Sequence, residues 1–446
     1  MSLKRNKKST TRLLVFLMLV SLLGGCTSDN ENAKKTEPEI EKSDSAGTVK
    51  QTDNEEVEIT VLYPHPEENF KSRFGTISEK LKNIKLVQLQ KGNDLESLQE
   101  LNAQKIVPDL IWGDGGAIEA TTELDMIEPL DELVKANNFD LSTIEPSIIA
   151  TYRAMNPNGS LIGMPTFSDN FTLYYNKDVF DKFGIPYPKE NLTWDDIVDL
   201  SKKLTGERDG MQYHGFEFGA YGEALVPLKQ FSVNLTDPDT GEVLIDKSPE
   251  VTKYLELMKR IYSIPGLYNK ESYQFPKGNV GMIVTWPQYL MWGIGDADIV
   301  KNVDAVPLPS WPELPNVSPT SYSHPIILNK YSKNKDAAFK VMAEFVSVEN
   351  QSRITRKGVD PSVLSVQEVR DQYGVDQELF EGKNIKAFFA TKPALPPSKI
   401  SPYDKYVNIN ESLAKFAESD MNIPEFLRKL KEESGAKIKD AISKQK

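Results

Sequence analysis

The segment from residue 57 to residue 114 alternates between extended and helical patterns, and this alternation limits the possible fold more than any other feature of the chain. The stretch "VEITVLYPH" (57–65) alternates apolar and polar residues and stops at Pro64 and Pro66, which is typical of a strand. Helical spacing follows in "FGTISEKLKNI", and "KLVQLQ" predicts a second strand. The stretch "DLESLQELNAQKIVPDLIWGD" predicts another helix and then a third strand.

Three strands that alternate with helices in this order predict an α/β fold in which helices cover both faces of a parallel sheet. In such sheets ligands bind beyond the carboxyl ends of the strands. We therefore expect His65 and the loop "WGDGG" (112–116) on one rim of the sheet.

Length and charge narrow the class of protein further. The chain has 446 residues, more than one hydrophobic core normally organises, and 39% of them are hydrophobic, so two lobes are expected. The formal net charge is -12, and the part expected to fold has no cluster of cations, which argues against nucleic acid as the partner.

The first 26 residues predict an export signal. Basic residues precede an apolar run from Leu13 to Leu23, which is short for a membrane span but suits a signal peptide. Cys26 is the single cysteine, so an intramolecular disulfide and a thiolate metal site are excluded. The sequence "LLGGC" resembles the bacterial lipoprotein signal, which implies that residues 1–25 are removed and that Cys26 is lipidated with acyl chains such as palmitate. An ordinary cleaved signal with an incidental cysteine is the alternative.

Residues 26–55 are almost all polar or charged and carry no periodic apolar face, which indicates a disordered tether. Such a tether would hold a folded protein away from a membrane and let it reorient.

Further elements follow from patterns along the rest of the chain. "FTLYYN" predicts a strand, followed by a short helix closed by Gly184 and Pro186 and by a helix with Thr193 as its N-cap. Ser248 is expected to cap another helix, "GNVGMIVTW" and "HPIILN" predict strands, and "SKNKDAAFKVMAEFVS" predicts an amphipathic helix. "NLTDPDTGEVLID" suggests a hairpin, "VDAVPLPSWPELPN" an irregular segment, and the tail from about residue 365 is expected to be mostly helical.

Several local strings occur in an order that resembles the extracellular solute-binding proteins of bacterial ABC importers, in the carbohydrate-type group that includes maltose-binding protein. These strings are "VPDLIWGD", "GSLIGMPTFSDNFTLYYNKDVFDKFGIP", "TWDDIVDLSKKLT", "KGNVGMIVTWPQY", "DAVPLPS" and "SKNKDAAFKVMAEFVS". The resemblance covers nearly all of residues 57–446.

The resemblance implies a two-lobed periplasmic-binding-protein-like (Venus flytrap) fold with discontinuous lobes and a hinge. Carried onto this chain, it implies one lobe of residues 57–166 plus 280–327 and another of 167–279 plus 328–446. The crossings near 165–171 and 276–280 are then hinge candidates.

A sugar presents flat C–H faces edged by hydroxyls, so a binding site needs aromatic rings and planar hydrogen-bonding groups. Trp112 and Asp114 offer such a pair, although Trp112 could also be the buried end of a strand. The resemblance implies that Asp169 is a ligand-binding carboxylate, with Phe167 and Asn170 beside it. Tyr174 and Tyr175 are better explained as core residues.

The resemblance also places Tyr221 where the family often stacks an aromatic ring. Trp286, Tyr289 and Trp292 form a dense aromatic group after a strand, and we expect at least one of them to face the cleft. Tyr322 lies where the family usually has a small or glycine-rich loop, so this wall of the site, with His324, departs from the family pattern.

Enzyme motifs are missing. The three histidines form neither HExxH nor an i, i+4 pair, and no GxSxG, P-loop or GxGxxG occurs. A glycosidase would need two carboxylates across a cleft, but the order of elements does not suggest an eightfold barrel. We expect no enzymatic activity, no metal and no cofactor.

The expected function is therefore that of a lipid-anchored extracytoplasmic receptor, a monomer, that binds a carbohydrate or oligosaccharide and delivers it to the transmembrane subunits of an ABC permease. The alternatives are a receptor of the same fold for peptides or another solute, and a sensor that presents ligand to a membrane kinase.

Overall fold

The computed structural model describes residues 56–114, 116–220, 222–267, 274–294, 297–321 and 323–444. The expected signal peptide, the lipidated Cys26 and the tether lie outside these residues, as do Tyr221 and Tyr322. Among the described helices, none is both long enough and apolar enough to cross a bilayer.

The first lobe is built on a five-stranded sheet with the order β2-β1-β3-β12-β4. Strand β1 pairs in parallel with β2 and β3, whereas β12 pairs antiparallel with both β3 and β4. The three parallel strands are those predicted from the opening alternation. The strands are β1 (Val57–Leu62), β2 (Ile84–Leu89), β3 (Leu110–Trp112), β4 (Met164–Pro165) and β12 (Pro325–Leu328).

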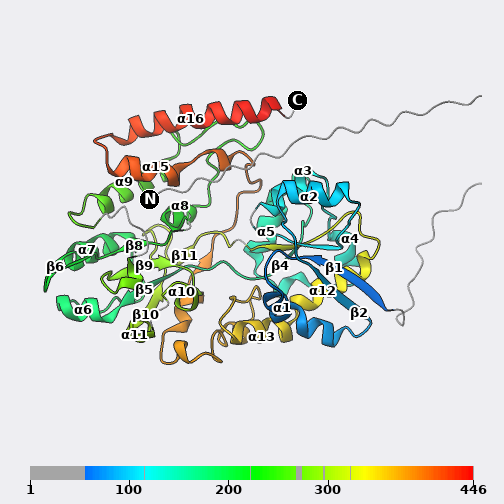
Figure 1. The fold of residues 1–446 in the computed structure, drawn as a ribbon. Coiled ribbons are helices and arrows are strands. Elements are labelled where there is room, and N and C mark those ends of the chain that lie inside the picture. Colours follow the sequence, from blue (N-terminus) through cyan, green and yellow to red (C-terminus); the bar gives the residue numbers. More distant parts are fainter. Residues whose placement is uncertain are drawn as a thin grey trace, which may run out of the picture. The chain divides into compact units, whose positions relative to one another are not determined.

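Helices gather around this sheet in Figure 1 and share one buried apolar core with it. They are α1 (Glu67–Lys80), α2 (Leu95–Ala103), α3 (Ala117–Glu123), α4 (Asp131–Ala136), α5 (Pro146–Met155), α12 (Lys335–Phe345), α13 (Val348–Arg356) and α14 (Gln367–Arg370), with the 3-10 turn η1 (Leu141–Thr143). In α1 the buried side chains are Phe70, Phe74 and Ile77, which recur every three to four residues and so face the sheet together.

The second lobe is built on a four-stranded sheet with the order β10-β5-β9-β8. Strand β5 lies antiparallel to β10 and to β9, and β8 is parallel to β9. The strands are β5 (Thr172–Asn176), β8 (Glu217–Phe218), β9 (Met282–Thr285) and β10 (Val303–Pro307). Two smaller sheets pair β6 (Gly206–Arg208) with β7 (Met211–Tyr213), and β11 (Val317–Ser318) with β13 (Lys392–Pro393).

The helices of the second lobe, which Figure 1 shows around its sheet, cover a larger share of the chain. They are α6 (Lys177–Phe183), α7 (Trp194–Leu204), α8 (Val226–Lys229), α9 (Pro249–Tyr262), α10 (Tyr289–Trp292), α11 (Ala297–Lys301), α15 (Ile409–Ala417) and α16 (Ile423–Lys444). The 3-10 turns are η2 (Glu223–Leu225), η3 (Phe275–Lys277), η4 (Glu378–Phe380), η5 (Ile385–Phe389) and η6 (Asp404–Tyr406).

Local sequence accounts for several helix ends. Thr193 and Asp196 form a capping box at the start of α7, so two backbone N–H groups gain side-chain partners. Ser248 accepts a hydrogen bond from the backbone N–H of Val251 at the start of α9. Gly184 ends α6 with a φ of 66°, a left-handed conformation that glycine adopts without steric strain. These helix boundaries confirm the predictions from the sequence.

The boundaries of the lobes differ from those expected. Residues 280–307 do not join the first lobe, because β9 and β10 flank β5 in the second sheet. The segment after β12 does not join the second lobe at once, because α12 and α13 pack on the first sheet. Residues 276–280 are accordingly no crossing, since Phe275 and Val280 lie in the core of the second lobe. The Pro-rich segment expected to be irregular begins with β10.

Within the part of the chain that the structure describes, the backbone passes between the lobes three times. The first crossing joins β4 to β5 through residues 166–171, as expected. The second runs from β11 to β12, and the third leaves the first lobe after Val369, which lies in the first core, and enters the second before Tyr373. Ser323, in the second crossing, is hydrogen-bonded to the first. Its Oγ accepts hydrogen bonds from the backbone N–H groups of Thr166 and Phe167 at 3.0 and 3.2 Å.

Candidate functional site

A cavity of about 390 Å³ lies where the crossings meet the two lobes. Its size falls in the range of small-molecule sites, and aromatic rings occur beside charged and amide groups in its wall. The first lobe, with the first crossing, contributes Arg73, His324, Val359 and Asp360 together with Phe167, Asp169 and Phe171; the second lobe contributes Gly222, Glu223, Lys229, Trp286, Gln288 and Trp292.

Two indole rings form the aromatic part of the second-lobe wall, and Phe167 and Phe171 of the first crossing add two phenyl rings. Trp286 follows β9, and Trp292 ends α10. The Trp292 side chain is 70% exposed, an unusual position for so large an apolar group. Tyr289, between them in sequence, is buried in the core of the second lobe and does not line the cavity. The structure therefore brings two of the three grouped aromatics to the cavity.

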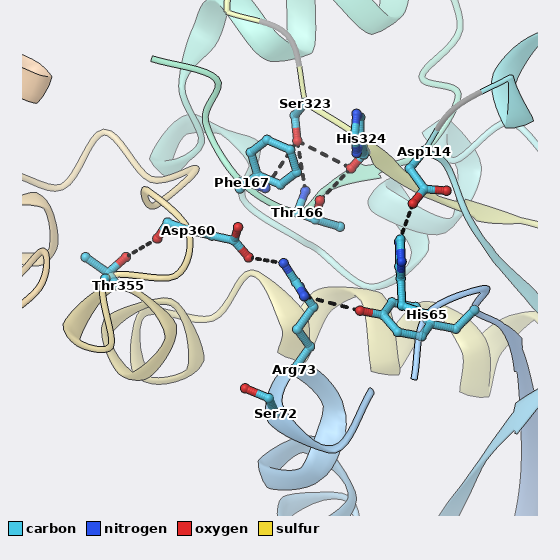
Figure 2. Close-up of polar contacts among 12 residues, drawn as sticks. His65, Ser72, Arg73, Asp114, Thr166, Phe167, Ser323, His324, Thr355 and Asp360 are labelled. Atoms are coloured by element: carbon cyan, nitrogen blue, oxygen red, sulfur yellow. Dashed lines mark hydrogen bonds and ion pairs between the residues drawn. The ribbon is translucent and has the colours of Figure 1, made fainter. Parts of the chain in front are cut away.

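Arg73 is the central cation on the first-lobe side, as Figure 2 shows. One of its terminal nitrogens, Nη2, donates to Asp360 Oδ2 at 2.6 Å and the other, Nη1, donates to the Tyr63 hydroxyl at 3.2 Å. The guanidinium also lies over the Trp112 ring, 5.3 Å from its centroid. Among the described residues, the buried Nε of Arg73 has no hydrogen-bond partner.

Trp112 lies in the core of the first lobe, where it packs edge-on against Tyr63 at 5.0 Å between ring centroids. Only 2% of its surface is exposed, and it does not line the cavity. Its position agrees with the alternative of a buried strand end, and its link to the site runs through Arg73.

Asp169 is the carboxylate of the first crossing that lines the cavity. Burial among surrounding atoms raises the pKa of Asp169 to about 7, Lys229 opposes this effect, and Glu223 adds to it. No hydrogen bond or ion pair joins its carboxylate to another described residue. A carboxylate in this position has free oxygens to offer to a ligand hydroxyl.

Asn170, which follows Asp169, makes its contacts within the protein. Its Nδ2 donates to the backbone oxygen of Phe388 at 3.0 Å, and its Oδ1 accepts from the Ser168 hydroxyl at 2.7 Å. Both polar ends of its side chain hold the first crossing in place, and Asn170 is not part of the cavity wall.

His65 and Asp114 lie together on the rim of the first sheet, as the parallel strand order predicts. His65 Nε2 and Asp114 Oδ2 are 2.5 Å apart, and Asn93 Nδ2 donates to the other oxygen, Oδ1, at 2.5 Å. Gly113 places this loop against β12, since its N–H donates to the Pro325 oxygen at 2.8 Å and a Cβ at Gly113 would lie 2.5 Å from the same oxygen. Both oxygens of Asp114 thus have protein partners.

His324 faces the cavity beside Phe167, whose ring lies edge-on to the imidazole at 5.1 Å between centroids (Figure 2). Desolvation lowers the pKa of His324, and the nearby Asp114 and Asp360 oppose this effect. The imidazole is therefore favoured in its neutral form, which can both donate and accept a hydrogen bond.

Sequence reasoning missed several residues of the wall. Arg73 lies in α1 one position before Phe74, where the predicted helical pattern begins, and Asp360 lies 287 residues further along the chain. Gln288 adjoins the aromatic group named above, and its buried Oε1 has no hydrogen-bond partner among the described residues. The position of the Gln288 amide between Trp286 and Trp292 in the sequence could have indicated its place in the site. No local sequence pattern indicates the pairing of Arg73 with Asp360.

A metal centre finds no support in the described part of the chain, where no group of three or more His, Cys, Asp or Glu side chains is placed to hold an ion. The polar side chains of the cavity are instead arranged as hydrogen-bond donors and acceptors next to indole rings.

Comparison with known proteins decides the family. The sequence model of the bacterial extracellular solute-binding proteins matches residues 78–352, which is more than half of the chain. The chain belongs to this family. Its two-lobed α/β fold agrees with this membership.

Relatives of this solute-binding protein include the sn-glycerol-3-phosphate-binding periplasmic protein UgpB of Brucella abortus, which is 30% identical over 133 residues. That match covers 28% of this chain and 30% of the relative, so the chain matches less than a third of that protein's length. A putative binding protein of Brucella abortus is 25% identical over 333 residues, covering 71% of this chain and 74% of the relative.

Solved structures share the fold of this solute-binding protein at lower identity. An ABC substrate-binding protein of Listeria monocytogenes in complex with cycloalternan aligns with a TM-score of 0.66 and 20% identity, covering 86% of this chain and 99% of that one. The sugar-binding protein MalE of Xanthomonas citri aligns with a TM-score of 0.69 and 18% identity, covering 87% and 100%. A sugar transporter from Rhizobium etli in an open conformation aligns with a TM-score of 0.70 and 18% identity, covering 85% of this chain and 99% of that one.

Proposed function

We propose that this chain is the substrate-binding component of an ABC importer, that it captures a carbohydrate or oligosaccharide in the cavity at the crossings, and that it delivers the loaded form to the permease. The observation that supports the sugar most directly is the pair of indole rings, Trp286 and Trp292, in one wall with the carboxylate of Asp169. Indole faces stack on the C–H faces of a sugar ring, while a carboxylate accepts from its hydroxyls.

Two polar atoms of the wall add to this support. Arg73 Nε is a donor and Gln288 Oε1 is an acceptor, and both are buried without a hydrogen-bond partner among the described residues. Buried polar groups are rarely left unpaired in folded proteins. A polyhydroxylated ligand that enters with a small rearrangement of these side chains would supply one donor and one acceptor where each is needed.

Sugars bound in solved structures of this fold guide the choice of ligands for a test. Maltose, mannotriose and α-D-tagatose occur in structures of this fold. We expect one class of sugar to raise the melting temperature of this protein in a thermal-shift screen, because a ligand that binds only the folded state stabilises it. A screen in which short peptides shift the melting temperature and no sugar does would overturn the sugar assignment.

A phosphorylated polyol is a second candidate, favoured by the cations of the cavity. Lys229 is exposed on α8, lines the cavity, and forms no ion pair with a described residue. The glycerol-3-phosphate-binding relative makes sn-glycerol 3-phosphate the natural probe. The substitution Lys229→Gln separates the two candidates, because removing the cation weakens binding of a phosphate and leaves binding of a neutral sugar nearly unchanged.

The lipid anchor and the importer belong to the same proposal. Lipidation of Cys26 is tested by metabolic labelling with a fatty acid in the wild type and in Cys26→Ser, where the serine variant should carry no label. Import predicts permease genes in the same operon, whereas a kinase gene there, with no permease, would favour the sensor.

A further inference from the structure

We propose that His65 is a ligand-contacting residue, that Asp114 is the residue that positions it, and that His65 Nδ1 accepts a hydrogen bond from a hydroxyl of the bound saccharide. The inference rests on the proposed function for the nature of the ligand. It reverses the roles expected from the sequence, where Asp114 was the acceptor for ligand hydroxyls.

Each oxygen of Asp114 already accepts a hydrogen bond from the protein. Asn93 donates to its Oδ1, and the 2.5 Å contact with His65 occupies its Oδ2. Asn93 is itself fixed, because its Nδ2 also donates to the backbone oxygen of Trp112 at 2.8 Å and its side chain is buried. The carboxylate is therefore held by an amide that belongs to the core of the first lobe.

This contact determines the tautomer of His65. A carboxylate only accepts hydrogen bonds, so the proton between the two groups lies on His65 Nε2. In a neutral imidazole the other nitrogen, Nδ1, then carries a lone pair and accepts. No described residue donates to Nδ1, and the His65 side chain is 44% exposed, compared with 15% for Asp114.

The rest of the loop keeps the ring in place. Gln88 Nε2 donates to the His65 backbone oxygen at 2.7 Å, and the Tyr63 ring lies edge-on to the imidazole at 5.2 Å between centroids. The Tyr63 hydroxyl in turn accepts from Arg73, which lines the cavity. Figure 2 shows His65, Asp114 and Arg73 on the same side of the first lobe, next to His324. His65 does not itself line the cavity, but its charge and that of Asp114 act on His324, which does. The proposed contact therefore requires a ligand that extends from the cavity past His324 toward the end of β1.

The histidine tautomers can be measured directly. The chain has three histidines, so long-range ¹H–¹⁵N spectra of the full chain labelled with ¹⁵N-histidine contain three imidazole patterns. At pH 8, where imidazoles are ordinarily neutral, we expect the Nε2–H tautomer for His65. His214 is an internal reference of the opposite tautomer, because its Nδ1 lies 2.8 Å from the Gly266 oxygen and must donate to it.

The positioning role of Asp114 is tested with Asp114→Asn. An amide can donate as well as accept, so this variant should no longer hold His65 in one tautomer, and the His65 pattern should shift while that of His214 stays unchanged. A wild-type His65 in the Nδ1–H tautomer, or an Asp114→Asn variant with an unchanged His65 pattern, would overturn the positioning role.

The ligand contact is tested by adding the sugar that gives the largest thermal shift among maltose, mannotriose and α-D-tagatose. We expect the His65 Nδ1 resonance to move and the His214 pattern to stay. His65→Gln keeps a donor for Asp114 but leaves no acceptor where Nδ1 lies, so it should weaken binding about three- to tenfold. His214→Gln is the matched control and should bind as the wild type does.

The outcomes separate this inference from the proposed function. A sugar that binds the wild type without moving the His65 resonance, or that binds His65→Gln with unchanged affinity, overturns the contact and leaves the sugar receptor standing. If short peptides bind and no sugar of the screen does, the proposed function fails, and the contact with a saccharide hydroxyl fails with it.

Discussion

Arg73 and Asp360 lie 287 residues apart in the sequence and form an ion pair of 2.6 Å between Nη2 and Oδ2. The pair joins helix α1 to the segment that follows α13, and both residues line the cavity. Their side chains are only 18% and 10% exposed, so the pair is shielded from solvent to about the same degree as the Arg370–Glu145 pair, at 16% and 12%.

Breaking this pair should cost more stability than breaking a surface pair. Arg73→Met leaves the Asp360 charge buried without its partner, and we expect the free energy of unfolding to fall by about 2–4 kcal/mol. Lys330→Met, which removes the exposed partner of Asp125, should change it by about 0–1 kcal/mol. Urea unfolding of both variants measures the difference. Equal losses in the free energy of unfolding would contradict the argument that burial makes the Arg73 pair the more important one.

Asp169 should make stability depend on pH. Burial raises its pKa to about 7, above the ordinary value of 3.8, so the folded state binds the proton more tightly than the unfolded state. The resulting stabilisation is fully present below about pH 4 and is lost as the pH rises through about 7.

Asp169→Asn removes this dependence because the amide is neutral at every pH. We expect the variant to match the wild type near pH 4 and to exceed it by about 1–3 kcal/mol at pH 8, less than the full shift implies because the carboxylate faces the open cavity. Urea unfolding at both pH values is the measurement, and parallel pH profiles for the two proteins would refute the prediction.

Trp292 should contribute to binding and hardly to folding. Its side chain is 70% exposed, so Trp292→Ala should change the free energy of unfolding by less than about 0.5 kcal/mol. Loss of a stacked ring should weaken sugar binding about tenfold or more. Tyr331→Ala is the control, because Tyr331 is another exposed aromatic residue, at 54%, that does not line the cavity. Titration calorimetry with the sugar from the screen should show a loss of affinity for Trp292→Ala and an unchanged affinity for Tyr331→Ala.

Gly113 should resist substitution although its neighbour in the same loop tolerates it. A Cβ at Gly113 would lie 2.5 Å from the Pro325 oxygen, whereas a Cβ at Gly116 would meet no atom within 4 Å. We expect Gly113→Ala to destabilise the protein by about 1–3 kcal/mol and to displace Asp114, while Gly116→Ala stays near the wild type. Thermal unfolding of the two variants gives the comparison, and similar melting temperatures would show that the loop yields easily.

The sequence predicted those parts of the fold that depend on neighbours in the chain. The parallel pairing of β1 with β2 and β3 followed from local periodicity, and so did the meeting of His65 with the loop after β3 on one rim. The caps at Thr193 and Ser248 are properties of four or five consecutive residues. Each of these features depends on an interaction between residues close together in the sequence, or on the handedness of the connections between parallel strands.

Long-range pairing explains what the sequence could not predict. Strand β10 begins a Pro-rich stretch, and only its antiparallel pairing with β5, more than 120 residues earlier, makes it a strand of the second lobe. The lobe boundaries depended on the same pairing.

Roles within the site also depended on distant partners. Asp114 looked like a free acceptor because its partners, Asn93 and His65, lie 21 and 49 residues away. Trp112 looked like a stacking surface until the packing of Tyr63 and Arg73 against it was known.

Three crossings between the lobes have a mechanical consequence. A single connecting segment would let one lobe twist about the chain, whereas three separate connections oppose such a twist. Ser323 ties two of these segments at residues 166 and 167, which shortens the length that can deform. The three connections therefore favour bending over twisting for any movement that brings the indole-bearing wall toward the wall with Arg73.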